Sequence, residues 1–140
     1  MKFWDASAVV PLIVAEPGGP PLLRLLKADP VMVAWWGTPV ECASALARRE
    51  REGTLRPADV AAALARLGAL SGAWEEVIPA DPVRTLAQRL LRVHDLRAAD
   101  SLQLAAALTA AEYQPPTLDF VSLDDRLNEA AEREGFRLAV

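Results

Sequence analysis

Four acidic residues lie at positions where carboxylates could act together on a metal ion. Asp5 directly follows a short apolar run, and Asp124 follows another near the C-terminus. Glu41 and Asp100 fall in the first turns of two predicted helices. In a parallel sheet, ligands bind beyond the carboxyl ends of the strands, where loops and helix N-termini converge. Carboxylates gathered there repel one another, and a hard cation such as Mg²⁺ relieves this repulsion. The pattern predicts hydrolysis by a metal-activated water.

Each acid also has a structural interpretation. Glu41 completes a Thr-x-x-Glu pattern, which is typical of a capping box at a helix N-terminus. Asp100 with Gln103 fits a helix cap, and Asp124 stands where an acid in the first turn interacts favourably with the helix dipole. Asp5 has the least structural reason to follow a buried strand, because a carboxylate there must be desolvated. Ser7 is predicted to cap the helix after it, with a hydrogen bond to a metal-bound water as the alternative. Capping and metal binding therefore both stay open for these acids.

The elements that must position these residues alternate along the chain. Short apolar runs that suit β-strands are followed by longer helical patterns, which indicates an α/β fold on a mostly parallel sheet. The predicted strands are 2–5, 31–35, 75–78, 118–121 and 136–140. The predicted helices are 6–14, 21–28, 38 to about 53, 57 to about 70, 81–93, 98 to about 112, and 124–134.

Size and composition predict one globular domain over residues 1–140. The chain has 52% hydrophobic and 24% charged residues, which is enough to fill one core. Charges and prolines interrupt every apolar stretch before it reaches the roughly 18 residues that a membrane span needs. Asp5 also lies where a signal peptide would need apolar residues. We therefore expect a cytoplasmic protein without a membrane segment.

Charge and the rare reactive residues exclude several functions. The net charge of −4 argues against a broad basic surface for nucleic acid, but acids gathered in a metal site would themselves produce it. The only cysteine, Cys42, lies in an apolar helical stretch and is predicted to be a buried structural thiol. The only histidine, His94, is predicted to end a helix. Zinc sites and Cys-His or Ser-His-Asp catalysis are therefore poorly supported.

Four segments in order resemble the motifs of the PIN-domain family and together span the chain. They are Asp5-Ala6-Ser7-Ala8, Glu41 after Thr38, the segment 96–105 around Asp100, and Phe120-Val121-Ser122-Leu123-Asp124. The compact length is similar to that of VapC-type toxins from bacterial and archaeal toxin–antitoxin pairs. The resemblance implies a three-layer α/β domain with five parallel strands in the order 3-2-1-4-5. It also implies an Mg²⁺- or Mn²⁺-dependent endoribonuclease.

The resemblance also implies roles for the four acids. Asp5 and Asp100 are the first candidates for metal ligands and Glu41 is the next, while Asp124 would assist a second metal ion or a water. Asp119 and Asp125 compete with Asp124 for its role.

Two positions depart from the pattern of the family. Ser122 stands where Thr is usual, and a serine hydroxyl can replace that of threonine. Gln103 stands where relatives often have His.

The implied partners are an RNA substrate, a cognate antitoxin and a second copy of the chain in a homodimer. In such pairs the antitoxin commonly covers the cleft and inserts a basic side chain among the acids. Two groups of arginines on predicted helices are candidates for RNA or partner contacts, although solvated helix faces also explain them. These are Arg48, Arg49 and Arg51, and Arg84, Arg89 and Arg92.

Other classes of protein fit the sequence less well. A catalytically inactive PIN-like module that binds RNA or protein is the main alternative, but all four acids are present. A phospho-acceptor receiver requires paired acids after the first strand and a late lysine, and no lysine follows Lys27. A haloacid-dehalogenase-type phosphatase requires Asp-x-Asp, where this chain has Asp5-Ala6-Ser7.

Overall fold

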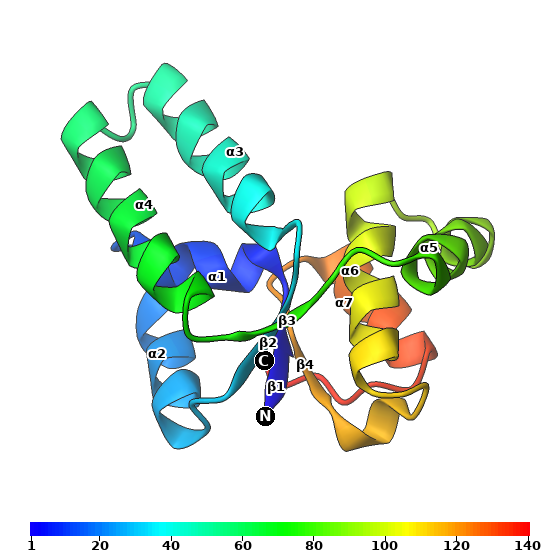
Figure 1. Ribbon diagram of the computed structural model, residues 1–140. Coiled ribbons are helices and arrows are strands. Elements are labelled where there is room, and N and C mark those ends of the chain that lie inside the picture. Colours follow the sequence, from blue (N-terminus) through cyan, green and yellow to red (C-terminus); the bar gives the residue numbers. More distant parts are fainter.

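A four-stranded parallel sheet forms the centre of the computed structural model, which describes all 140 residues (Figure 1). Strand β1 (Lys2–Trp4) pairs with β2 (Met32–Trp35) on one side and with β4 (Asp119–Val121) on the other. Strand β3 (Glu75–Val77) pairs with β2, so the strand order is β3-β2-β1-β4. The predicted α/β class with a parallel sheet is confirmed.

Helices form a layer on each side of this sheet (Figure 1). One layer contains α1 (Ala6–Ile13), α2 (Gly19–Ala28), α3 (Thr38–Arg51) and α4 (Pro57–Ser71). The other contains α5 (Asp81–Val93), α6 (Ala98–Ala110) and α7 (Asp125–Arg133), and a short 3₁₀ helix (Pro115–Thr117) precedes β4. None of the helices has both the length and the apolar character needed to cross a membrane.

The strands build one hydrophobic core on each face of the sheet. Successive side chains of a strand point to opposite faces, and parallel strands covered on both sides are apolar throughout. In β1, Phe3 enters the core with residues of α5, α6 and α7, whereas Trp4 enters the core with residues of α1 to α4. Both side chains are fully buried. This packing fixes β1 in the middle of the sheet, with Asp5 directly at its carboxyl end.

The predicted fifth strand, 136–140, is wrong, and the five-stranded order implied by the family resemblance is corrected to four strands. This segment forms a single parallel bridge between Leu138 and Phe120. The backbone N–H and C=O groups of successive residues in a strand point alternately to its two sides. In the three-residue strand β4, only the middle residue therefore points these groups away from β1. In β4 this residue is Phe120, whose N–H donates to Arg137 and whose C=O accepts from Ala139, each at 2.9 Å. The C-terminal segment thus lies at the fifth position without extending the ladder.

The first prediction concerns the anchoring of β4. Phe120 is fully buried and packs between Phe3 and Phe136, with ring centroids 5.6 and 5.5 Å away. We expect Phe120→Ala to lower the free energy of unfolding by about 3 to 5 kcal/mol, measured by urea denaturation, because it leaves a cavity in the core. The control is Leu64→Ala on α4, where the side chain is 43% exposed, and its effect should be within about 1 kcal/mol. Equal effects of the two variants would contradict this packing.

Candidate active site

The carboxyl edge of the sheet brings the four predicted acids into one region. Asp5 follows β1 directly and Asp124 follows β4 after two residues, while Glu41 and Asp100 lie in the first turns of α3 and α6. Glu41, Asp100 and Asp124 line a common cleft of about 630 Å³. Asp5 is 3% exposed, and its carboxylate interacts electrostatically with those of Glu41 and Asp100. The structure therefore brings together all four acids.

The carboxylate of Asp5 is held through one of its two oxygens. The backbone N–H of Ser7 donates to Oδ2 at 3.2 Å, so Asp5 is the N-cap of α1. The hydroxyls of Ser7 and Ser122 donate to the same oxygen at 2.5 and 2.9 Å. Burial raises the pKa of Asp5, and these hydrogen bonds oppose the rise. All three bonds end on Oδ2, which leaves Oδ1 outside this network.

Ser7 and Ser122 also connect the start of α1 to the loop after β4. Their Oγ atoms lie 3.1 Å apart. Ser7 Oγ accepts from the backbone N–H of Leu123 at 2.9 Å, and Ser122 Oγ accepts from that of Asp124 at 3.0 Å. The predicted capping role of Ser7 is wrong, because the cap is Asp5 and Ser7 lies inside the helix. The two serines instead fix Asp5 and Asp124 relative to one another.

Glu41 does not belong to a capping box. Helix α3 begins at Thr38 after Gly37, with no side-chain cap, and the Thr38 hydroxyl accepts from Nε2 of Gln103 at 3.0 Å. The same Nε2 donates to Glu41 Oε2 at 2.7 Å. The capping interpretation is wrong, because the side chains of Thr38 and Glu41 both bind the buried amide of Gln103 on α6.

The pKa of Glu41 is raised to about 7. Burial is the main cause, because it disfavours the charged form, and the neighbouring charges of Asp5 and Asp100 add to it. The hydrogen bond from Gln103 acts in the opposite direction. Glu41 thus changes its charge close to neutral pH.

Asp100 and Asp124 lie at the N-termini of α6 and α7, line the same cleft and interact electrostatically. Burial raises the pKa of Asp100, the charge of Asp124 adds to this, and Arg97 and Arg126 oppose it. No side chain caps α6. Asp124 is the N-cap of α7, since its Oδ1 accepts from the backbone N–H of Leu127 at 2.8 Å. The capping interpretation of Asp100 is therefore wrong, and Asp124, which was expected only to interact with the helix dipole, is itself the cap.

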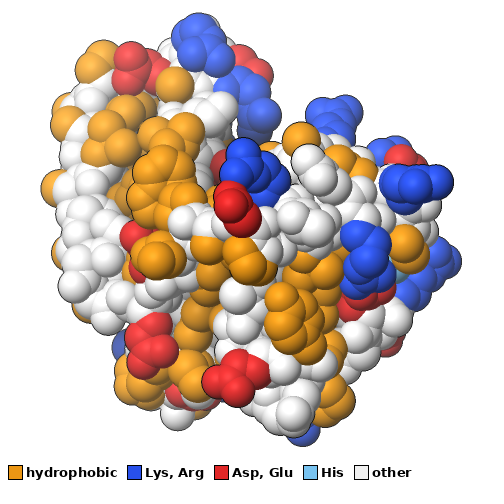
Figure 2. All heavy atoms as spheres, turned by 45° about the vertical axis from the view of Figure 1, so that its right-hand side comes forward, with side chains coloured by type: hydrophobic (Ala, Val, Ile, Leu, Met, Phe, Trp, Pro, Cys, Tyr) orange, Lys and Arg blue, Asp and Glu red, His pale blue; other side chains and the backbone are white.

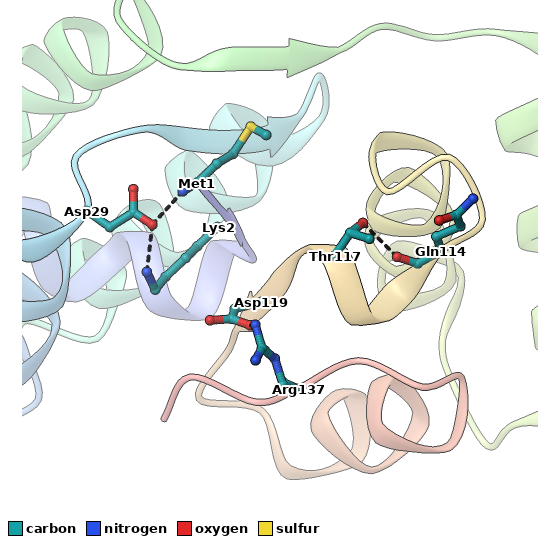
Figure 3. A network of polar contacts seen from close by, with 7 residues as sticks. All are labelled: Met1, Lys2, Asp29, Gln114, Thr117, Asp119 and Arg137. Carbon is teal, nitrogen blue, oxygen red and sulfur yellow. Dashed lines mark hydrogen bonds and ion pairs between the residues drawn. The ribbon is translucent and has the colours of Figure 1, made fainter.

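The two acids that compete with Asp124 lie outside the cleft. Asp119 is the first residue of β4, in register with Lys2 at the amino end of β1, and pairs with Arg137 at 2.8 Å (Figure 3). Asp125 is the first residue of α7 and does not line the cleft. Placement thus favours Asp124 as the fourth acid.

Arginines line the cleft together with the acids. Arg48 comes from α3, Arg97 precedes α6 and Arg126 comes from α7. Arg126 lies 3.6 Å from Asp95, with both side chains largely exposed, whereas Arg48 and Arg97 form no ion pair. Figure 2 shows Lys and Arg side chains on both sides of the hollow between the two halves of the molecule. Positive charge thus flanks a group of negative charges.

Of the six predicted arginine contacts, only Arg48 lines this cleft. Arg49 pairs with Glu16, Arg84 with Asp81 and Arg89 with Glu134. Sequence reasoning missed Arg97 and Arg126, although each lies within three residues of a predicted acid. The spacing of seven residues between Glu41 and Arg48, about two helical turns, is the signal that places Arg48 on the same face of α3.

The cysteine and the histidine lie at positions that indicate a structural role. Cys42 is fully buried, and burial raises the pKa of its thiol to about 12, which is unfavourable for thiolate chemistry. His94 is the C-cap residue of α5, and its Nε2 lies 2.9 Å from Oε2 of Glu134. Both predictions are confirmed.

The donor chemistry of the cleft fits a hard divalent cation. The four acids offer only oxygen ligands, and three have a raised pKa because the site is desolvated and crowded with like charge. No group of three or more His, Cys, Asp or Glu side chains is arranged in the structure as a ready metal-binding set. The fit therefore rests on the type of ligand and on the electrostatic coupling.

The architecture is shared with solved structures of other proteins. The chain matches no model of a known protein family and no curated protein. It is similar to VapC20 of Mycobacterium tuberculosis, a toxin that cleaves the sarcin–ricin loop, with 21% identity, a TM-score of 0.66, and 97% of this chain and 96% of the other covered. It is also similar to FitAcB from Neisseria gonorrhoeae, with 15% identity, a TM-score of 0.67, and 99% and 96% covered.

Likeness at these identities shows the fold. The chain has a PIN fold of the VapC type, so the resemblance stated from the sequence is confirmed for the fold.

The second prediction follows from the raised pKa of Glu41. Its value in the folded chain, about 7, lies above the ordinary value of 4.5, so the unfolded chain ionises first as the pH rises. The folded state consequently loses stability between about pH 4.5 and pH 7. We expect Glu41→Gln to be more stable than wild type at pH 8 in metal-free buffer, because glutamine cannot ionise. The advantage should disappear at pH 4.5 in urea denaturation, and an advantage independent of pH would contradict the assignment.

Proposed function

We propose that this chain is a divalent-metal-dependent endoribonuclease and the toxin of a toxin–antitoxin pair, with residues 1–140 as one nuclease domain. The observation that carries the proposal is the electrostatic coupling of four carboxylates at the carboxyl edge of a PIN-type sheet, where Glu41, Asp100 and Asp124 line one cleft and the buried Asp5 interacts with Glu41 and Asp100. The likeness to VapC20, an RNA-cleaving toxin, supports RNA as the substrate. The arginines around the acids are consistent with a polyanionic substrate.

In this proposal Asp5, Glu41 and Asp100 hold Mg²⁺ or Mn²⁺, and Asp124 assists a second ion or the attacking water. When bound, such an ion supplies an activated water and neutralises charge on the phosphate. Asp5 is oriented by the two serine hydroxyls on Oδ2. Asp124 is held by its cap bond to Leu127, which directs its carboxylate from the end of a helix at the cleft.

The arginines would bind the RNA backbone. A cleft of acids alone repels phosphate, and each arginine offers a planar set of donors that matches phosphate oxygens. Arg48 and Arg97 form no ion pair within the chain, so their donors can contact RNA without breaking one. Contacts to the backbone carry no base information. The contacts to phosphate would hold the RNA chain across the acids.

A protein partner would use the same edge of the molecule. Trp36 after β2, Val40 in the first turn of α3 and Ile78 after β3 are exposed by 54%, 69% and 66%. Large apolar side chains that gather on one part of a surface are typical of sites where a partner binds. They support the proposed antitoxin, whose basic side chain would be attracted to the acids. The homodimer stays a prediction that sedimentation or light scattering can check.

The third prediction tests metal-dependent catalysis. We expect cleavage of single-stranded or looped RNA in Mn²⁺ or Mg²⁺, abolished by EDTA and by Asp5→Asn or Asp100→Asn. Asparagine at position 5 can still accept the serine hydrogen bonds and cap α1, so circular dichroism should stay native. Asp119→Asn is the matched control, because Asp119 pairs with Arg137 at the other edge of the sheet. Full cleavage by both folded site variants would exclude these ligands, and a lack of cleavage by the wild type would favour an inactive PIN-like module.

The fourth prediction tests the arginines. We expect Arg48→Gln and Arg126→Gln each to reduce kcat/KM by about tenfold, mainly through KM, since each removes a charged hydrogen bond to phosphate. The slope of log(kcat/KM) against log[salt] should fall by about 0.7 for each lost contact. Arg133→Gln on α7 is the control, because it removes the same charge but Arg133 pairs with Glu129 outside the cleft. Equal salt slopes in all three variants would exclude phosphate contacts by Arg48 and Arg126.

A further inference from the structure

Gln103 is a fully buried polar side chain next to the acids but outside the proposed ligand set. It lies on α6 three residues after Asp100, and therefore close to the same face of the helix. Its Nε2 donates to Glu41 Oε2 at 2.7 Å and to Thr38 Oγ1 at 3.0 Å. An ionised carboxylate only accepts hydrogen bonds, so Glu41 determines which end of the amide faces α3.

The stability of the fold alone does not explain this amide. Gln103 Oε1 is buried without a hydrogen-bond partner. A buried unpaired oxygen is unfavourable, whereas an apolar side chain of the same length would avoid the problem. The amide thus lies at a position where packing favours an apolar residue. Its two donor contacts, and the residues at their other ends, must supply the reason.

Electrostatics indicates what the amide does. Glu41 shares the site with Asp5 and Asp100, whose negative charges disfavour its ionised form. A flexible glutamate on the wall of an open cleft can reduce this repulsion by rotating away from the other acids. The bond from Gln103 opposes that rotation, because it attaches Oε2 to a rigid helix. Thr38 fixes the amide in turn through the second N–H.

We propose that Gln103 is a positioning residue that holds the Glu41 carboxylate beside Asp100, so that helix α6 supplies one metal ligand and orients another. The inference rests on the proposed function, because it concerns the ion that these acids would bind. Hydrogen-bond partners of ligating carboxylates commonly change metal affinity by 10- to 100-fold when they are removed.

The test compares Gln103→Met with the wild type. Methionine has nearly the length and flexibility of glutamine but no donor, so the core stays filled while the bond to Glu41 is lost. Binding of Mn²⁺ is measured by electron paramagnetic resonance of the free ion, and stability by urea denaturation in metal-free buffer. We expect the Kd for Mn²⁺ to rise by about 10- to 100-fold. The metal-free stability should change only modestly, because removal of the unpaired buried Oε1 partly offsets the loss of the bonds to Glu41 and Thr38.

Ser101→Ala is the matched control for a buried polar group on the same helix. Ser101 is 1% exposed and donates only to the backbone oxygen of Ala98, at 2.8 Å. This variant should keep the wild-type Kd for Mn²⁺. A similar rise in Kd for Ser101→Ala and Gln103→Met would overturn the inference, since any disturbance of α6 would then be sufficient.

Thr38→Val provides a second variant if Gln103→Met does not fold. It keeps the shape of the side chain but removes the second anchor of the amide, so a smaller rise in the Kd for Mn²⁺ is expected. Wild-type affinity in Gln103→Met, or in Thr38→Val if only that variant folds, would overturn the inference and leave the proposed function intact. A wild-type chain that binds no Mn²⁺ would overturn both.

Discussion

The main constraint on this molecule is the repulsion among partly or fully desolvated carboxylates at one edge of the sheet. Burial raises the pKa of Asp5, Glu41 and Asp100, and the charges of neighbouring acids add to the effect. Such a group is stable only if nearby donors offset part of the cost. The hydrogen bonds around the cleft have this distribution: serine hydroxyls contact Asp5, an amide contacts Glu41 and a backbone N–H contacts Asp124.

The fold supplies these donors from segments that are distant in the sequence. Ser122 reaches Asp5 across 117 residues, because β4 lies directly beside β1. Gln103 reaches Glu41 across 62 residues, because α6 packs against β2, the strand that precedes α3. The cores on both faces hold the strands in register. Any shift of β4 or α6 would therefore change the charge balance of the cleft as well as the packing.

The sequence predicted the elements and the acids much better than their hydrogen-bond partners. Strand and helix positions follow local apolar periodicity, which needs no knowledge of tertiary contacts. Four acids at strand ends and helix starts could be grouped, because parallel strands end at one edge. The prediction of a fifth strand was wrong, because β4 is too short to offer a second residue whose backbone groups point away from β1. The prediction of a capping box at Thr38 was wrong, because the Thr38 hydroxyl binds Gln103 instead. No local sequence pattern connects these two residues.

Capping and metal binding were alternatives in the sequence, but the structure makes them compatible. Asp5 and Asp124 are N-caps of α1 and α7, and Glu41 and Asp100 lie in the first turns of α3 and α6. The N-terminus of a helix carries a partial positive charge and free N–H groups, both of which stabilise a nearby carboxylate. Four helices thus begin at the same cleft, and each offsets part of the repulsion that its own acid creates. Negative charge is thus concentrated at the cleft without a buried lysine or arginine among the acids. Such a residue would compete with the proposed cation for the same oxygens.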